Sequence, residues 1–129
     1  MKLIILSILI LTSVAGCHTN DDSITDSDLT GSWNLTHVSG GLAGIDKSFE
    51  PSLIVWTFDE NTGMVTIVNN SEDGFSIFQS GSYPFLIEDA EDYKTITIDG
   101  MIFGSIEISK NQVKIDQRVA DGFLLELTK

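Results

Sequence analysis

Few side chains in this sequence have the chemistry of a nucleophile, a base or a metal ligand. The single thiol is Cys17, and the two imidazoles belong to His18 and His37. Two histidines far apart in the sequence, with no second cysteine, lack the ligand spacing of a zinc site. His37 alternates with Trp33 and Leu35 in one run. We therefore expect it to line a β-structure or lie at its mouth, as a structural or rim residue.

Carboxylates are abundant and could bind calcium or act in pairs as acid and base. The densest cluster comprises Glu88, Asp89, Glu91 and Asp92, and the segment 59–63 resembles half of a calcium-binding loop. Both stretches lack the spacing and glycine of an EF-hand, and both suit solvated turns. Nothing singles out one acid as part of a glycosidase pair. We predict no catalytic residue, no metal and no cofactor. An enzyme of unrecognised type is the third alternative, after a ligand-binding role and a protein-binding role.

The composition limits the partners of the chain. At 129 residues it is long enough for one modest core and hence one domain. The 19 acidic and 7 basic residues give a net charge of −12, and Arg118 is the single arginine. Nucleic-acid binding needs clustered lysines and arginines, so nucleic acid is excluded as a partner. A single cysteine excludes an internal disulfide, so the fold depends on its apolar core.

The first residues have the layout of a secretion signal. Lys2 supplies a positive charge, and residues 3–11 form an apolar run too short to span a bilayer permanently. The sequence Val-Ala-Gly-Cys at 14–17 resembles the lipobox of bacterial lipoproteins. This resemblance implies that residues 1–16 are a signal peptide that is removed, and that Cys17 carries acyl chains such as palmitate. The alternative is an ordinary cleaved signal followed by a chance cysteine.

Residues 17–30 are polar and acidic, and they predict a flexible tether between the lipidated Cys17 and the folded domain. The pair Asp21-Asp22 resembles the export signal that sends Bacteroidetes-type lipoproteins to the outer face of the outer membrane. The alternative is a solvated acidic linker. The resemblance implies a lipid-anchored protein of the bacterial cell envelope, in the outer membrane and exposed at the surface if the acidic pair is an export signal.

From residue 31 onward, short apolar and β-branched runs alternate with turn residues, as in a sandwich or barrel. The predicted strands are 31–38, 52–59, 64–68, 74–79, 82–88, 95–99, 101–109, 112–116 and 123–128. Asp-Gly pairs at 73–74, 99–100 and 121–122 predict turns between strands, and Pro84 predicts an edge or seam position. Because open edges invite aggregation, we predict an all-β domain over residues 31–129. It is a single antiparallel β-barrel of about eight or nine strands, closed or partly open.

Gly31-Ser32-Trp33, at the start of the first strand, resembles the Gly-x-Trp motif of the lipocalins. The whole domain is similar to the small lipocalin-like lipoproteins of Bacteroidetes, and it also looks somewhat like the META lipoprotein domains, without their cysteine. The resemblance implies that Trp33 closes one end of the barrel. It also implies that a late arginine, here Arg118, packs across that ring in a cation–π contact of about 1 to 2 kcal/mol. The Thr-Asp-Tyr motif and C-terminal helix of classical lipocalins are missing.

Aromatic side chains at alternate strand positions either pack the core or line an apolar cavity. The candidates for a cavity lining are Trp33, Trp56, Phe58, Tyr83 and Phe85. Our first hypothesis is a lipid-anchored envelope protein that binds a small apolar ligand inside the barrel. The second is a solid-core module whose loops or acidic surface meet another envelope protein. A hollow barrel favours the first hypothesis, and a packed interior favours the second.

Overall fold

The computed structural model describes residues 28–73, 75 and 77–129, and this part of the chain is all β apart from one short 3₁₀ helix. Its elements are β1 (Gly31–Gly40), β2 (Ile45–Ser48), β3 (Ile54–Asp59), β4 (Met64–Asn69), β5 (Gly81–Asp89), β6 (Lys94–Ile98), β7 (Met101–Ile108), β8 (Gln112–Asp116), η1 (Arg118–Ala120) and β9 (Phe123–Thr128).

The strands close into an antiparallel barrel. From β3 to β9 each strand pairs with the next along the chain, and β1 joins the two ends by pairing with β3 on one edge and β9 on the other. The barrel therefore has eight strands, and β2 is a ninth strand paired with the end of β1. This confirms the predicted all-β antiparallel barrel and shows that it is closed.

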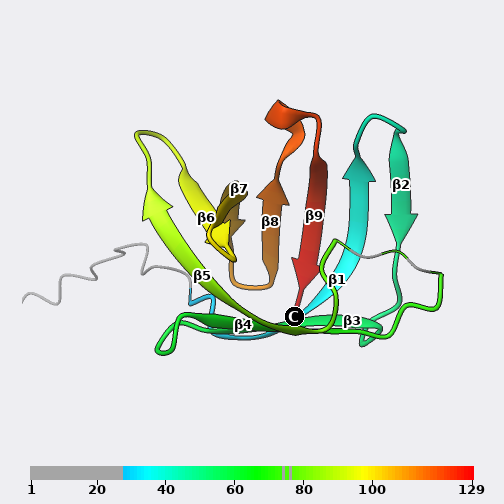
Figure 1. The fold of residues 1–129 in the computed structure, drawn as a ribbon, viewed down its shortest axis with the longest axis horizontal. Coiled ribbons are helices and arrows are strands. Elements are labelled where there is room, and N and C mark those ends of the chain that lie inside the picture. Colours follow the sequence, from blue (N-terminus) through cyan, green and yellow to red (C-terminus); the bar gives the residue numbers. More distant parts are fainter. Residues whose placement is uncertain (1–27, 74, 76) are drawn as a thin grey trace, which may run out of the picture.

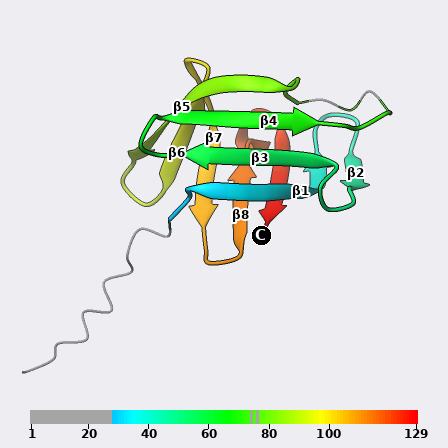
Figure 2. The ribbon, with the colours of Figure 1, turned by 90° about the horizontal axis from the view of Figure 1, so that it is seen from below.

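The barrel is flattened into two layers whose strands cross. Figure 2 shows β1, β3, β4 and β5 side by side in one layer, with β7 and β8 running across behind them. In Figure 1 the second layer faces the viewer, with β8, β9, β1 and β2 side by side above β3 and β4, which are seen edge-on along the bottom. Because β1 is long, its start belongs to one layer and its end to the other, and so it holds both layers together.

Local sequence explains the turns and the seam in β5. Asp99 and Gly100 have φ values of 53° and 78°, the left-handed conformation that a two-residue hairpin requires and that Asp and Gly tolerate. They link Ile98 directly to Met101. Pro84 is the last residue of β5 paired with β4, just before the pairing with β6 begins. A missing amide hydrogen costs least at such a seam, as the sequence predicts.

The core consists of inward-facing residues from every barrel strand except β5, whose Tyr83, Phe85 and Ile87 are half-buried against it. Its largest fully buried side chains are Trp33, Trp56 and Phe58, surrounded by isoleucine, leucine and valine. Leu29, just before β1, is also fully buried and accepts a hydrogen bond from the indole Nε1 of Trp33 at 2.8 Å. Every strand pairing and buried side chain of the described residues lies between Leu29 and Lys129.

One predicted strand is wrong, and one strand of the structure was not predicted. β2 lies in a segment rich in glycine and charge that shows no apolar alternation, and its pairing with β1 defines it. The predicted strand 74–79 is not a strand at its described residues. There the side-chain Nδ2 of Asn69 donates to the carbonyl oxygens of Phe75 (3.2 Å) and Phe78 (3.5 Å), so a side chain takes the place of a ladder partner.

Candidate functional site

The aromatic residues predicted to line a cavity lie in the barrel interior, where they pack against one another. Trp33, Trp56 and Phe58 are at most 1% exposed, and Trp33 faces Trp56 across the β1–β3 ladder. Phe85 meets Phe58 edge-on, with ring centroids 5.2 Å apart. Edge-to-face aromatic pairs are a favourable packing arrangement. The structure thus brings these four residues together as core.

Tyr83, the fifth candidate, belongs to an aromatic cluster that joins the loop before β5 to the core. Its ring lies 5.1 Å from that of Phe78, and its hydroxyl donates a 2.8 Å hydrogen bond to the carbonyl oxygen of Gln79. Phe78 in turn contacts Trp56 and Phe103, at 5.8 and 5.1 Å between ring centroids. This side of the interior is therefore filled by side chains, which favours the packed alternative over a ligand cavity.

A concave groove lies on the outer side of the barrel, beside the first half of β7. β8 pairs with β7 only from Ser105 onward, where it lies opposite Asp116, and the chain then leaves the sheet for η1. The groove left at this divergence has a volume of about 650 Å³, within the range of sites for drug-sized molecules. Its lining residues are Tyr93, Thr95, Ile102, Phe103, Gly104, Ser105, Asp116, Gln117, Val119, Ala120 and Gly122.

Apolar side chains stand in solvent around this groove. Tyr93 is 58% exposed, Ile102 76%, and Val119 is fully exposed. Tyr93 comes from the hairpin between β5 and β6, Ile102 from β7, and Val119 from η1, which connects β8 to β9. Figure 1 shows the β5–β6 hairpin on one side of β7 and the connection with η1 on the other. Single exposed apolar residues are ordinary, whereas several that share one concavity mark a binding surface.

Gly104 keeps the floor of the groove open. A Cβ atom there would lie 2.7 Å from the carbonyl oxygen of Asp116 and 3.3 Å from Cγ of Gln117. Any side chain at this position would push β7 away from the start of η1. The close approach of the two backbones therefore depends on glycine.

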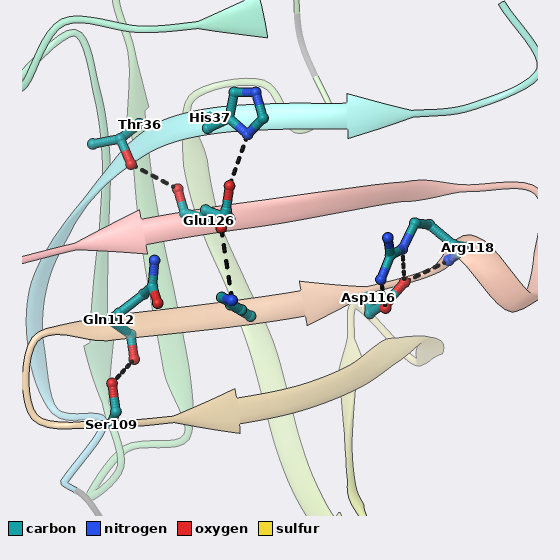
Figure 3. A network of polar contacts seen from close by, with 8 residues as sticks. Thr36, His37, Ser109, Gln112, Asp116, Arg118 and Glu126 are labelled. Atoms are coloured by element: carbon teal, nitrogen blue, oxygen red, sulfur yellow. Dashed lines mark hydrogen bonds and ion pairs between the residues drawn. The ribbon is translucent and has the colours of Figure 1, made fainter. Parts of the chain in front are cut away.

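One ion pair sits at the end of β8, beside the groove. The carboxylate of Asp116 accepts hydrogen bonds from Nε and Nη2 of Arg118 at 3.0 and 2.7 Å, the two-pronged contact drawn in Figure 3. The guanidinium lowers the pKa of Asp116 and the carboxylate raises that of Arg118. Asp116 is thus held ionised and positioned, which suits a structural role better than proton transfer.

The predicted contact of Arg118 with Trp33 is wrong. Arg118 lies near the far end of β1, where its Cγ is 3.6 Å from the position of a Cβ on Gly40. The cation over the Trp33 ring is Lys129, with Nζ 4.7 Å from the ring centroid. Trp33 does lie at an end of the barrel, beside Leu29.

His37 faces the outside of the barrel, which corrects its predicted place beside Trp33 and Leu35. A β-bulge between Leu35 and His37 makes Thr36 an extra residue, so that Val38 takes the next inward position. The bulge is held by the carbonyl oxygen of Thr36, which accepts a hydrogen bond from the amide of Phe49 at 2.9 Å. The alternation predicted for β1 therefore fails at this one residue.

The imidazole of His37 is clamped between two carboxylates. Nε2 lies 2.6 Å from Oδ1 of Asp46 on β2, and Nδ1 lies 2.7 Å from Oε2 of Glu126 on β9; the second contact is drawn in Figure 3. Lys114 on β8 is 3.9 Å from the other oxygen of Glu126. The hydrogen bonds that His37 donates to Asp46 and, to a smaller extent, to Glu126 raise its pKa. With both nitrogens donating to carboxylates, this imidazole has no lone pair for a metal or a substrate proton.

The acidic stretches considered for calcium serve as turns. Oδ1 of Asp59 accepts hydrogen bonds from the backbone amides of Asn61 and Thr62, at 3.0 and 3.4 Å. The four acids at 88–92 lie at the end of β5 and in the hairpin that follows it. Among the residues that the structure describes, no three His, Cys, Asp or Glu side chains are grouped to hold a metal ion.

Sequence reasoning missed the groove as a site. Its signals were two short apolar pairs at turns, Met101-Ile102 after Asp99-Gly100, and Val119-Ala120 before Asp121-Gly122. Alternation alone gives one apolar face to a strand, so adjacent apolar residues at a turn place one of them outside. The sequence does not reveal that these two turns flank the same stretch of β7.

Residues 1–27 lie outside the described part, and with them the predicted signal peptide, the lipidation site Cys17 and most of the tether. Among the described residues, no helix has the length and apolar character needed to cross a membrane. No protein-family model, no curated protein sequence and no solved structure matches this chain.

Proposed function

We propose that this protein is a lipid-anchored binding protein of the bacterial cell envelope that holds a small apolar ligand in the groove beside β7. The observation that carries the proposal is the groove itself. Its concave surface of about 650 Å³ is bordered by the exposed side chains of Tyr93, Ile102 and Val119. Burying exposed apolar area is worth roughly 25 cal/mol per Å², so these side chains provide a driving force for binding.

The groove is a better binding site than the barrel interior. Inside, Trp56, Phe58 and the other aromatic side chains fill the space that a ligand would occupy. Ligand entry there would require the core to come apart, whereas the groove is formed before any ligand arrives. The original hypothesis of an apolar ligand is thereby kept, with its site moved from the inside to the outside of the barrel.

Binding rather than catalysis is the role proposed for this groove. Asp116 is its one lining carboxylate, and Arg118 holds that group ionised. Thr95, Ser105 and Gln117 provide the polar atoms that would orient a ligand. A general acid or base needs a pKa near the working pH, and the shift at Asp116 is in the opposite direction.

Ligand binding is tested with the neutral fluorescent probe N-phenyl-1-naphthylamine and the chain from residue 18 onward, which contains every strand of the described barrel. The double variant Ile102→Ser/Val119→Ser removes two apolar walls of the groove. Leu42→Ser is the matched control, since Leu42 is 92% exposed and is not part of the groove. We expect the probe to fluoresce with wild type and control and to lose at least half its affinity with the double variant. Equal fluorescence for all three chains would rule the groove out.

The anchor is proposed from the sequence at 14–17 and is tested on the full chain. Intact mass is measured on protein extracted from membranes of a bacterial host, for wild type and Cys17→Ala. The expected wild-type product begins at Cys17 and is heavier by its acyl chains, and the variant loses both features. An unmodified chain from wild type would leave Cys17 a free thiol and would contradict a lipid anchor.

A protein segment as the occupant of the groove is the second candidate. It is favoured by apolar surface that continues beyond the groove, because Leu86 on β5, Thr97 on β6 and Ile102 on β7 follow one another across the ladder. Leu86 is 54% exposed. Photo-crosslinking from position 86 in cells tests this candidate. A discrete crosslinked protein that disappears with Ile102→Ser would favour a protein partner over a small ligand.

A further inference from the structure

The groove beside β7 is apolar at its centre and acidic at its borders. Four carboxylates lie within two residues of a lining residue and form no ion pair with any residue that the structure describes. They are Glu91, Asp92, Glu107 and Asp121. Glu91 and Asp92 are neighbours in one hairpin, so these two charges act together, because surface charges interact over a Debye length of about 8 Å in physiological salt.

The cations near the groove are already paired with other carboxylates. The pairs are Lys94 with Asp89 at 3.5 Å, Lys114 with Glu126 at 3.9 Å, and Arg118 with Asp116 at 2.7 Å. They leave little positive charge to offset the four unpaired acids. The chain as a whole carries −12, so no distant excess of positive charge reverses the field at the groove.

Tyr93 gives the acidic border a face suited to a cation. This ring is 58% exposed, lines the groove, and follows Glu91 and Asp92 directly in the hairpin before β6. An aromatic face beside carboxylates is the surface that binds ammonium groups through cation–π attraction. Ile102 and Val119, which also line the groove, are the surfaces for an apolar tail.

We propose that the ligand of this groove is a cationic amphiphile, with its positive group held between Tyr93 and the acids of the 90–93 hairpin and its apolar part against Ile102 and Val119. The inference rests on the proposed function and adds the chemical class of the ligand. The same charges disfavour fatty-acid anions, an anionic bilayer surface and a second copy of this acidic chain, because each would bring negative charge to the border.

The test compares three amphiphiles of equal alkyl chain length: decyltrimethylammonium, decyl maltoside and decanoate. Each is titrated below its micelle concentration into the chain from residue 18 onward, and binding is followed by NMR shifts of the groove amides. We expect decyltrimethylammonium to bind roughly five to ten times more tightly than decyl maltoside, and decanoate to bind most weakly. Added salt should reduce the preference for the cation.

Variants separate the charge from the apolar contact. Glu91→Gln/Asp92→Asn should weaken decyltrimethylammonium about threefold and leave decyl maltoside unchanged. Tyr93→Leu keeps an apolar wall and should likewise lower affinity for the cation alone. Glu50→Gln is the control, because it removes an exposed carboxylate from the segment between β2 and β3, which contributes nothing to the groove.

The outcomes distinguish the two proposals. Equal affinity for the three amphiphiles, lost with Ile102→Ser/Val119→Ser, would overturn the cationic ligand and keep the groove as an apolar site. Preference for decanoate would also overturn the cationic ligand. If none of the three amphiphiles shifts the groove amides, both proposals are contradicted. A cation preference that Glu91→Gln/Asp92→Asn and Tyr93→Leu abolish, and Glu50→Gln does not, would support both.

Discussion

Lys129 lies over the indole of Trp33, with its Nζ 4.7 Å from the ring centroid. The indole is completely buried from solvent, and its Nε1 donates to the carbonyl oxygen of Leu29. The residues before β1 and after β9 therefore meet at one tryptophan. This contact lies at the end of the barrel at which β1 begins.

Replacing Lys129 with Gln should lower the free energy of unfolding by about 0.5 to 1 kcal/mol, the range for an exposed cation–π contact. Urea denaturation followed by tryptophan fluorescence measures the change. Lys110→Gln is the control, since Lys110 is exposed in the turn between β7 and β8. A loss with Arg118→Gln in place of Lys129→Gln would mean that the cation over Trp33 is misassigned.

The stability of the fold should depend on pH through the protonation of His37. The two carboxylate partners raise its folded pKa above 6.5, so the protonated imidazole contributes stability that is fully present below 6.5 and is lost as pH rises through the folded pKa. Melting temperature is compared for wild type and His37→Gln across this interval. The wild-type advantage should shrink on the alkaline side, because β2 is tied to the barrel partly through the contact of His37 with Asp46.

NMR titration of the His37 ring gives the pKa directly, and Asp46→Asn should lower it while leaving the contact with Glu126 in place. Parallel stability curves for wild type and His37→Gln would show that the clamp contributes nothing to folding.

Phe58 is buried deeply enough that truncating its side chain should strongly lower the free energy of unfolding. It is 1% exposed and packs against the rings of Trp56 and Phe85, so Phe58→Ala should cost about 3 to 5 kcal/mol through lost burial and the cavity left behind. Val119→Ala, at a fully exposed apolar site, should change the free energy of unfolding by less than about 0.5 kcal/mol. Chemical denaturation measures both. A small effect of Phe58→Ala would indicate a loosely filled interior.

Adding a single methyl group at Gly104 should disturb the groove. In Gly104→Ala the new Cβ would meet the backbone carbonyl of Asp116 at 2.7 Å, so β7 or η1 must shift at a cost of about 1 to 3 kcal/mol. Amide shifts of the groove residues should change with it. Gly81→Ala is the matched strand control, where the nearest atom is the Tyr83 hydroxyl at 3.4 Å. If both variants behave alike, the close backbone contact at Gly104 is unimportant.

The sequence by itself determined most of the strands and turns, because those signals are local. Apolar alternation predicted β3, and the left-handed tolerance of Asp99 and Gly100 predicted the turn between β6 and β7. The seam at Pro84 followed from its missing amide hydrogen. Each of these inferences needs only neighbouring residues.

Tertiary structure decided the features that depend on residues far apart in the chain. The bulge that turns His37 outward depends on β9 and on Phe49, and the cation at Trp33 depends on where the last residue lies. The candidate site exists because β8 leaves β7 after Asp116. Alternation in one strand cannot report such pairings, since the energy that fixes them comes from contacts made only after the barrel closes.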